Sequence, residues 1–146
     1  MSRIGRFLRL SSRDKLLLAQ AVSLFLAAHV CLWLFSLRIT RRLFSWQVRE
    51  ARPLTASQLI WAVNRTAAFL PFITCMPQAI AAQSLFALYG YRAAIRIGVA
   101  PPVDSRLQAH AWLEYRGEAV LGASELDRYT ILLTLGKSED KDLCLK

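Results

Sequence analysis

Hydrophobic positions near the start of the chain form one long run without a charged residue. Residues 16–37, "LLLAQAVSLFLAAHVCLWLFSL", carry no formal charge when His29 is neutral. About 20 apolar residues are enough for a helix to cross a bilayer, and a helix that is apolar on every side is buried in protein or in lipid. The pattern predicts a helix, leaves both environments open, and places His29 and Cys31 among the core residues.

A second helix is predicted over residues 56–69. Apolar residues recur every three or four positions between residues 60 and 70, which is helical spacing. Thr55 or Ser57 can cap its first turn. Pro71 ends it, because the residue before a proline is pushed out of the α region.

A third helix is predicted within "TCMPQAIAAQSLFALYG", residues 74–90. Thr74 is a suitable N-cap residue, which makes Cys75 the first helical residue. Pro77 is tolerated in the first turn, and Gly90 suits the left-handed residue that follows a helix. Apolar residues lie on nearly every face, so this helix is expected at the centre of the domain.

The second half of the chain changes to strand patterns. A strand is predicted over residues 94–99, ended by Pro101 and Pro102. Residues 106–122, "RLQAHAWLEYRGEAVLG", alternate on either side of Arg116-Gly117 and predict a hairpin. Residues 129–135 predict a last strand.

The hairpin turn also predicts which residues face each other. A two-residue turn places Tyr115 opposite Glu118 and His110 opposite Ala123. A group that orients the His110 ring is therefore expected near positions 122 to 124.

Length and charge indicate one domain with an uneven charge distribution. The chain has 146 residues and a net charge of +9, and residues 1–52 hold ten Lys or Arg against two Asp or Glu. We predict a basic, hydrophobic helical region over 1–52, a core domain over 53–136 and a disordered tail over 137–146. The remainder of the chain lacks the alternation of aromatic and basic residues that tracks single strands, so no nucleic-acid partner is expected.

Cysteine usage excludes several other classes. The three cysteines, Cys31, Cys75 and Cys144, have no paired spacing, which argues against a disulfide framework and for a reducing compartment. No His and Cys spacing typical of zinc is present, and the six glycines form no phosphate loop. We expect no metal and no cofactor.

The residues with distinctive chemistry are Cys75 and His110. The start of a helix carries partial positive charge, which stabilises a thiolate, and its free N–H groups can hold an oxyanion. A histidine brought to that sulfur would serve as its base. The alternative is structural: free cysteines are often small buried hydrophobes, and a strand histidine without a partner usually packs.

Two segments of the sequence carry a resemblance to a known family. "TCMPQAIAAQSLFALYGYRAAIRIGV" and "AHAWLEYRG" resemble the transglutaminase-like cysteine proteases of lasso-peptide biosynthesis, which remove the leader from the precursor peptide. The resemblance covers nearly the whole chain. It implies an α+β fold with a papain/transglutaminase-like core, in which the cysteine-bearing helix packs on a small antiparallel sheet behind a hydrophobic N-terminal helical region. Cys75 matches the nucleophile and His110 the base.

The third catalytic member of that family is missing from its usual place. The family's acid lies about a dozen residues after the histidine, where this chain has Gly122. The role of holding the imidazole then falls to a backbone carbonyl, to Ser124 or to Asp127, or a Cys-His dyad suffices.

Three further residues complete the predicted site. Backbone N–H groups at Cys75 or Met76 would hold the oxyanion. Trp112 would wall the cleft and Gln78 would face it. Core packing for Trp112, and a surface or core position for Gln78, are the alternatives.

The resemblance also implies partners. The substrate would be the precursor leader peptide, presented by a separate leader-recognition protein because the chain has no room for that domain, and the ATP-dependent lasso cyclase is a further candidate partner. We expect a cytoplasmic protein, with membrane contact through residues 16–37 left open. Two alternatives to hydrolysis remain: acyl transfer to an amine at the same site, and a catalytically degenerate, membrane-attached scaffold.

Overall fold

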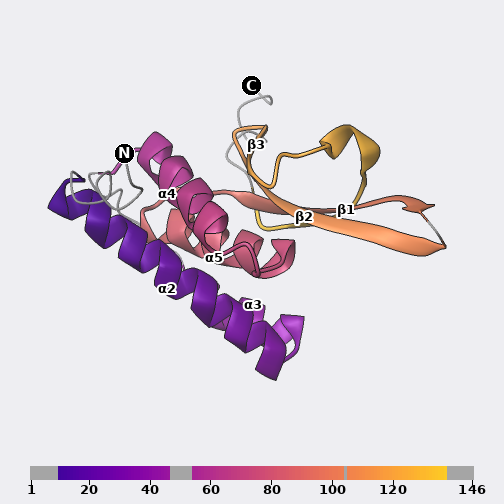
Figure 1. The fold of residues 1–146 in the computed structure, drawn as a ribbon, viewed down its shortest axis with the longest axis horizontal. Coiled ribbons are helices and arrows are strands. Elements are labelled where there is room, and N and C mark those ends of the chain that lie inside the picture. Colours follow the sequence, from indigo (N-terminus) through magenta and orange to yellow (C-terminus); the bar gives the residue numbers. More distant parts are fainter. Residues whose placement is uncertain (1–9, 47–53, 104, 138–146) are drawn as a thin grey trace.

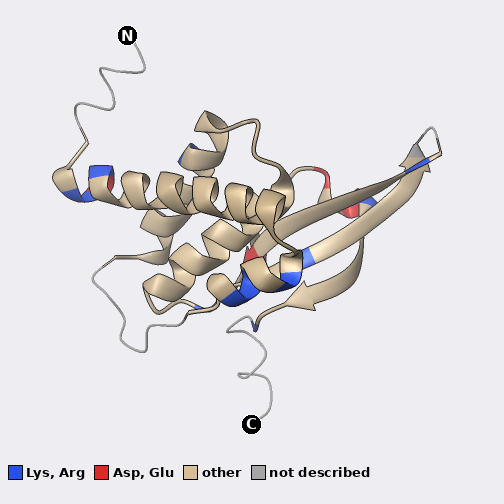
Figure 2. Cartoon of the chain, turned by 90° about the horizontal axis from the view of Figure 1, so that it is seen from below, with Lys and Arg blue, Asp and Glu red and all other residues tan. Residues whose placement is uncertain are grey.

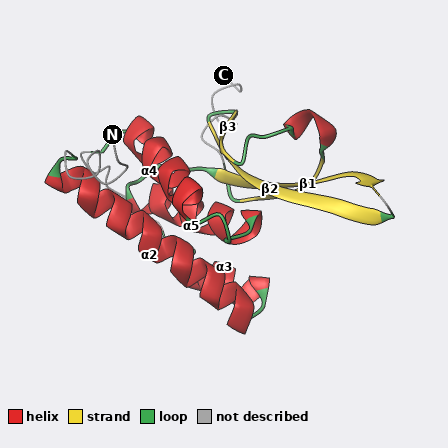
Figure 3. Cartoon of the chain, in the orientation of Figure 1, coloured by secondary structure: helices red, strands yellow, loops and turns green. Residues whose placement is uncertain are grey.

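The structure consists of a layer of helices packed on one face of an antiparallel sheet (Figures 1 and 3). It is a computed structural model that describes residues 10–46, 54–103 and 105–137. In chain order the elements are α2 (Ser12–Leu34), α3 (Leu37–Leu43), α4 (Ala56–Phe69), α5 (Cys75–Leu88), β1 (Ala94–Val103), β2 (Arg106–Tyr115), β3 (Glu118–Leu121), the short 3-10 helix η1 (Leu126–Arg128) and β4 (Thr130–Leu135). Nearly all of the predicted tail, including Cys144, lies outside the described residues.

Most of the long apolar run forms one helix, α2, as predicted, and its last residue, Leu37, is the first residue of α3. The side chain of Ser11 caps α2 by accepting a hydrogen bond from the N–H of Asp14. α2 ends at Leu34, and Ser36 takes an extended conformation before α3 begins. α2 is the one described helix that is long and apolar enough to cross a membrane, a property that core helices and signal sequences share.

One face of α2 belongs to the core of the domain. Its buried residues recur at helical spacing on one side and pack against α4 and α5: Leu17, Leu18, Ala21, Phe25 and Ala28. The hydroxyl of Tyr89 also donates a hydrogen bond to Oε1 of Gln20, which joins α2 to the end of α5. The other predicted core residues of this helix, His29 and Cys31, are only half-buried.

α4 begins with a capping box. Oγ1 of Thr55 accepts a hydrogen bond from the N–H of Gln58 at 3.3 Å, and Oε1 of Gln58 accepts one from the N–H of Thr55 at 2.9 Å. Of the two predicted caps, Thr55 is therefore the one used. Each bond satisfies a backbone donor that the first turn leaves free.

Removing this cap should destabilise the domain measurably. Replacement of Thr55 by Ala is expected to lower the free energy of unfolding by about 1 kcal/mol, which corresponds to about 2–4 °C in Tm for a chain of this size. Ser57→Ala is the matched control, because Ser57 is exposed one residue inside the helix and makes no capping bond. Thermal melts of both variants measure the difference, and equal Tm values would contradict the assignment.

The sheet has the order β3-β2-β1-β4 with antiparallel pairing throughout. β1 runs through both prolines to Val103, further than predicted. Pro101 and Pro102 fall where the pairing of β1 with β2 shifts register, so the missing N–H groups cost no ladder hydrogen bond. The hairpin turn is as predicted, with positive φ at both Arg116 and Gly117.

Alternation along β2 divides its side chains between the two faces of the sheet. Ala111 and Leu113 lie in the core cluster shared with α5, together with Ile95 of β1. The residues between them point to the opposite face. On that face Arg96 donates two hydrogen bonds to the Glu114 carboxylate, at 2.7 and 3.1 Å.

Candidate active site

Cys75 is the first residue of α5, at a helix start that no side chain caps. Thr74 has the extended conformation of an N-cap residue, but its hydroxyl makes no capping hydrogen bond. The side chains that precede α2 and α4 do make such bonds. Because Pro77 has no N–H, the free backbone donors of the first turn are those of Cys75 and Met76.

The side chains around Cys75 are held in place by packing and by one hydrogen bond. Cys75 is half-buried, and Met76 packs against the core beside it. Nε2 of Gln78 donates a hydrogen bond to the carbonyl of Ile73 at 2.7 Å, so this amide fastens the loop that leads into the helix. Because its side chain packs against the core, Met76 can contribute to the predicted site through its backbone N–H.

His110 lies in β2, and a backbone carbonyl fixes its ring. Nε2 of His110 is 2.8 Å from the carbonyl oxygen of Gly122. A carbonyl oxygen only accepts hydrogen bonds, so Nε2 carries the hydrogen. In the neutral ring Nδ1 is then the acceptor, which is the state that a general base requires.

The carbonyl of Gly122 reaches the ring because the pairing of β2 with β3 is irregular. Tyr115 faces Glu118 as predicted, but the register then shifts by one, so Leu113 faces Leu121 and the ladder ends there. His110 is consequently not paired with Ala123. Gly122 has a φ of 75°, and a Cβ atom on it would lie 3.3 Å from Nε2 of His110.

The two side chains considered as the third catalytic member do not contact the histidine. Ser124 is exposed in a turn, and Asp127 is exposed in η1. Within the described residues, neither makes a hydrogen bond with His110. The group that bonds to the ring is instead the backbone carbonyl of Gly122.

Two aromatic rings hold the other sides of the imidazole. Trp112 stacks against it with ring centroids 6.1 Å apart, and Tyr129 lies at 5.3 Å. Gly98 of β1 faces His110 across the ladder, and a Cβ there would come within 3.0 Å of both Trp112 and Tyr129. Tyr129 was not predicted; a glycine inside a strand, which often marks a close approach, was the available signal.

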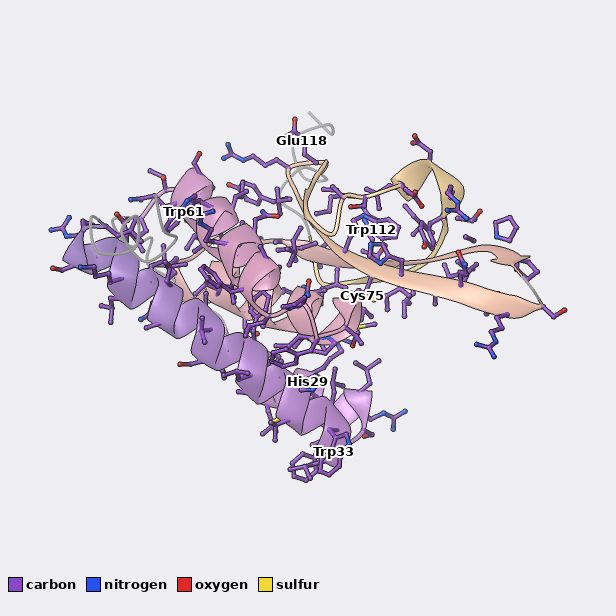
Figure 4. All side chains as sticks on the ribbon, viewed as in Figure 1. His29, Trp33, Trp61, Cys75, Trp112 and Glu118 are labelled. Carbon is purple, nitrogen blue, oxygen red and sulfur yellow. The ribbon has the colours of Figure 1, made fainter. Side chains whose placement is uncertain are left out.

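Cys75 and His110 lie at similar distances from one contact between α5 and β2 but on opposite sides of the sheet, and within the described residues they form no hydrogen bond with each other. The rings of Phe86 and Tyr115 meet with centroids 5.5 Å apart. Cys75 precedes Phe86 by about 16 Å of helix, and His110 precedes Tyr115 by about 16 Å of strand. Figure 4 places Cys75 and Trp112 at a similar position along the sheet and on opposite sides of the β2 ribbon.

Within the part of the chain that the structure describes, neither Sγ of Cys75 nor Nδ1 of His110 has a hydrogen-bond partner. His110 shares the face of Trp112, away from the core residues Ala111 and Leu113 that pack toward α5. The described part of the chain also contains no group of three or more His, Cys, Asp or Glu residues that could hold a metal ion.

The structure is thus an α+β domain with a cysteine at the start of α5 and a histidine on the adjacent sheet. A family model described as the transglutaminase-like superfamily matches residues 22–134, more than half of the chain. The chain therefore belongs to the transglutaminase-like superfamily, which includes cysteine peptidases and acyltransferases. No curated protein and no solved structure matches it.

The left-handed conformation of Gly122 predicts that a substitution there destabilises the protein. Gly122→Ala is expected to lower the free energy of unfolding by about 1–2 kcal/mol, because the left-handed region is unfavourable for residues with a Cβ. The added atom also crowds Nε2 of His110 and the carbonyl of Ala111. Thermal melts should show a loss of about 3–6 °C in Tm.

A second measurement reports on the histidine itself. The ring ¹⁵N shifts of His110 should indicate the Nε2–H tautomer in the parent chain and a mixture of tautomers in Gly122→Ala. Ala123→Ser, on the exposed neighbouring residue, is the control and should change neither quantity. An unchanged tautomer in Gly122→Ala would show that another group holds the ring.

Proposed function

We propose that this protein is a cysteine peptidase that removes the leader from a lasso-peptide precursor. Cys75 is the nucleophile and His110 the base, and a separate recognition protein presents the leader. The proposal is supported by the motifs around these two residues and by membership of a superfamily that includes cysteine peptidases.

The observation that carries the proposal is the hydrogen bond from Nε2 of His110 to the carbonyl of Gly122. It keeps Nδ1 as the acceptor, which is what the acid of a triad does for its histidine. A carbonyl lacks the negative charge that stabilises an imidazolium. The positive end of α5 lies beside Cys75 and can stabilise the negative charge of the oxyanion.

The proposal requires the sulfur and Nδ1 to meet when substrate binds. Catalytic hydrogen bonds are often long or poorly aligned in the free enzyme and shorten in the substrate complex. Because the His110 side chain points to the face of the sheet opposite α5, the required movement is larger than a rotation of the ring. The start of α5 or the segment of β2 around His110 must shift until both side chains reach the same face.

The chemistry then follows a nucleophilic sequence. Nδ1 of His110 takes the thiol proton, and the Cys75 thiolate attacks the carbonyl carbon of the scissile peptide. The N–H groups of Cys75 and Met76 hold the oxyanion. The C–N bond breaks as the imidazolium returns its proton to the leaving amine, and water then hydrolyses the thioester while His110 accepts the water proton.

Product masses test the proposal directly. The chain is incubated with a precursor peptide and its recognition protein, and the mixture is analysed by mass spectrometry. Hydrolysis gives a free leader acid and a free core peptide whose masses sum to that of the precursor plus one water. A product of leader joined to an added primary amine would identify acyl transfer instead, and an intact precursor would exclude both activities for this substrate.

A further inference from the structure

We propose that α2 and α3 attach the protein to an anionic membrane surface, with α2 lying in the plane of the interface rather than across the bilayer. This surface is separate from Cys75 and His110, and the proposal does not rest on the catalytic function.

Helix α2 has two different faces. Opposite its buried face runs a stripe of exposed apolar residues at helical spacing: Leu16, Leu26, Val30, Trp33 and Leu34. Trp33 is 82% exposed, and Figure 4 shows it at the far end of α2, pointing away from the rest of the molecule. We call this stripe the outer face of α2.

Helix α2 is attached to the rest of the domain along its length. Phe25 and Ala28 are fully buried against neighbouring helices, and the hydrogen bond of Gln20 with Tyr89 joins it to α5. At the other end, Thr40 of α3 is fully buried, and Ser84 of α5 donates to the carbonyl of Phe44. A transmembrane orientation would break these contacts, whereas an interfacial one uses only the outer face.

Basic residues lie near both ends of this apolar face. Arg13 lies near the start of α2, while Arg38, Arg41 and Arg42 lie on α3; none has an ion-pair partner among the described residues. Figure 2, seen from the side of α2 and α3, shows an uncharged middle of α2 with basic residues at its start and on α3. The three α3 arginines also line an open depression of about 500 Å³ beside Leu133 and Leu135 of β4.

These features together match an anionic lipid surface better than a protein partner. Interfacial helices bury an apolar face at the boundary of headgroups and acyl chains, and tryptophan and basic residues prefer that depth. Arginines near the surface then attract anionic headgroups, at about fivefold in affinity per residue. The occupant assigned to the outer face of α2 is therefore an anionic bilayer.

Vesicle flotation tests the proposal with the full chain. Vesicles of phosphatidylcholine containing phosphatidylglycerol should carry the protein upward, and vesicles of phosphatidylcholine alone should carry much less. Trp33→Ala is expected to weaken binding about tenfold, since it removes the most exposed apolar side chain of the stripe. Arg38→Gln together with Arg42→Gln should weaken it about 25-fold on the anionic vesicles.

Matched controls separate the surface from general effects. Leu107→Ala removes an apolar side chain that is 70% exposed on the hairpin, and Arg65→Gln removes a charge on exposed α4; neither should change flotation. Alkaline carbonate should release the bound protein.

Four outcomes would overturn the proposal. Resistance to carbonate would indicate a transmembrane helix. Absence of binding to both kinds of vesicle would exclude lipid as the occupant, and a self-associated chain that becomes monomeric on Trp33→Ala would assign the outer face to a second copy. Binding unaffected by the Trp33 and arginine variants would place the membrane contact elsewhere.

Discussion

Cys75→Ala should abolish precursor cleavage, with a fall in rate of at least about a thousandfold. The substitution removes the only atom in the proposed mechanism that forms a bond with the substrate carbonyl. Because Cys75 is half-buried, and alanine suits the first turn of a helix, the variant should remain folded and should still bind the recognition protein. Cleavage is measured by mass spectrometry of the precursor, and folding by thermal melts.

Cys31→Ala is the matched control for this result. Cys31 is a second half-buried cysteine, located on α2 rather than at a helix start. Its replacement should leave the cleavage rate unchanged. If Cys75→Ala cleaves the precursor at the parental rate, Cys75 is not the nucleophile and the proposed mechanism is wrong.

His110→Ala is the second large effect, with an expected fall in cleavage of about a hundredfold to ten-thousandfold. The thiol would lose its base and the leaving amine its acid. A substrate-independent readout is the rate at which iodoacetamide alkylates Cys75, followed in the peptide that contains it. That rate should fall in His110→Ala if the imidazole and the sulfur meet in solution.

His29→Ala is the control for both measurements. His29 is half-buried on α2, and its ring contacts Phe72 in the segment that leads into α5. The double variant with Cys75→Ala and His110→Ala should cleave no more slowly than Cys75→Ala alone, because residues that act together are not additive. Unchanged cleavage and alkylation in His110→Ala would show that Cys75 does not act together with His110.

His110 and Cys75 form no hydrogen bond with each other in the described structure, so two separate measurements are needed. The structure has a cysteine at an uncapped helix start and a histidine on the opposite face of the sheet, and within the described residues neither Sγ of Cys75 nor Nδ1 of His110 makes a hydrogen bond. Alkylation kinetics measure whether the pair forms without requiring the correct substrate. The cleavage assay then measures what the pair does.

Local features of this protein followed from the sequence because short-range physics decides them. Thr55 and Thr74 begin helices, Gly90 follows one, and Arg116-Gly117 turns the hairpin. Each depends on the backbone preferences of a few neighbouring residues. The position of Cys75 at a helix start was predictable for that reason.

Longer-range features required the tertiary structure. The register shift between β2 and β3 depends on how the end of the hairpin packs, and it brings the carbonyl of Gly122 to His110. Tyr129 reaches the same ring because β4 returns beside β1, where Gly98 leaves room. A backbone acceptor also leaves no trace in side-chain composition.

The apolar run of α2 shows most clearly which features the sequence determines and which depend on tertiary packing. Composition alone determined that residues 16–37 contain a helix with no charged face, and such a helix satisfies lipid and protein interiors equally. Only tertiary packing decided that Phe25 and Ala28 enter the core while Trp33 remains exposed. Burial depends on which surfaces meet in space, and one segment of sequence does not specify its neighbours.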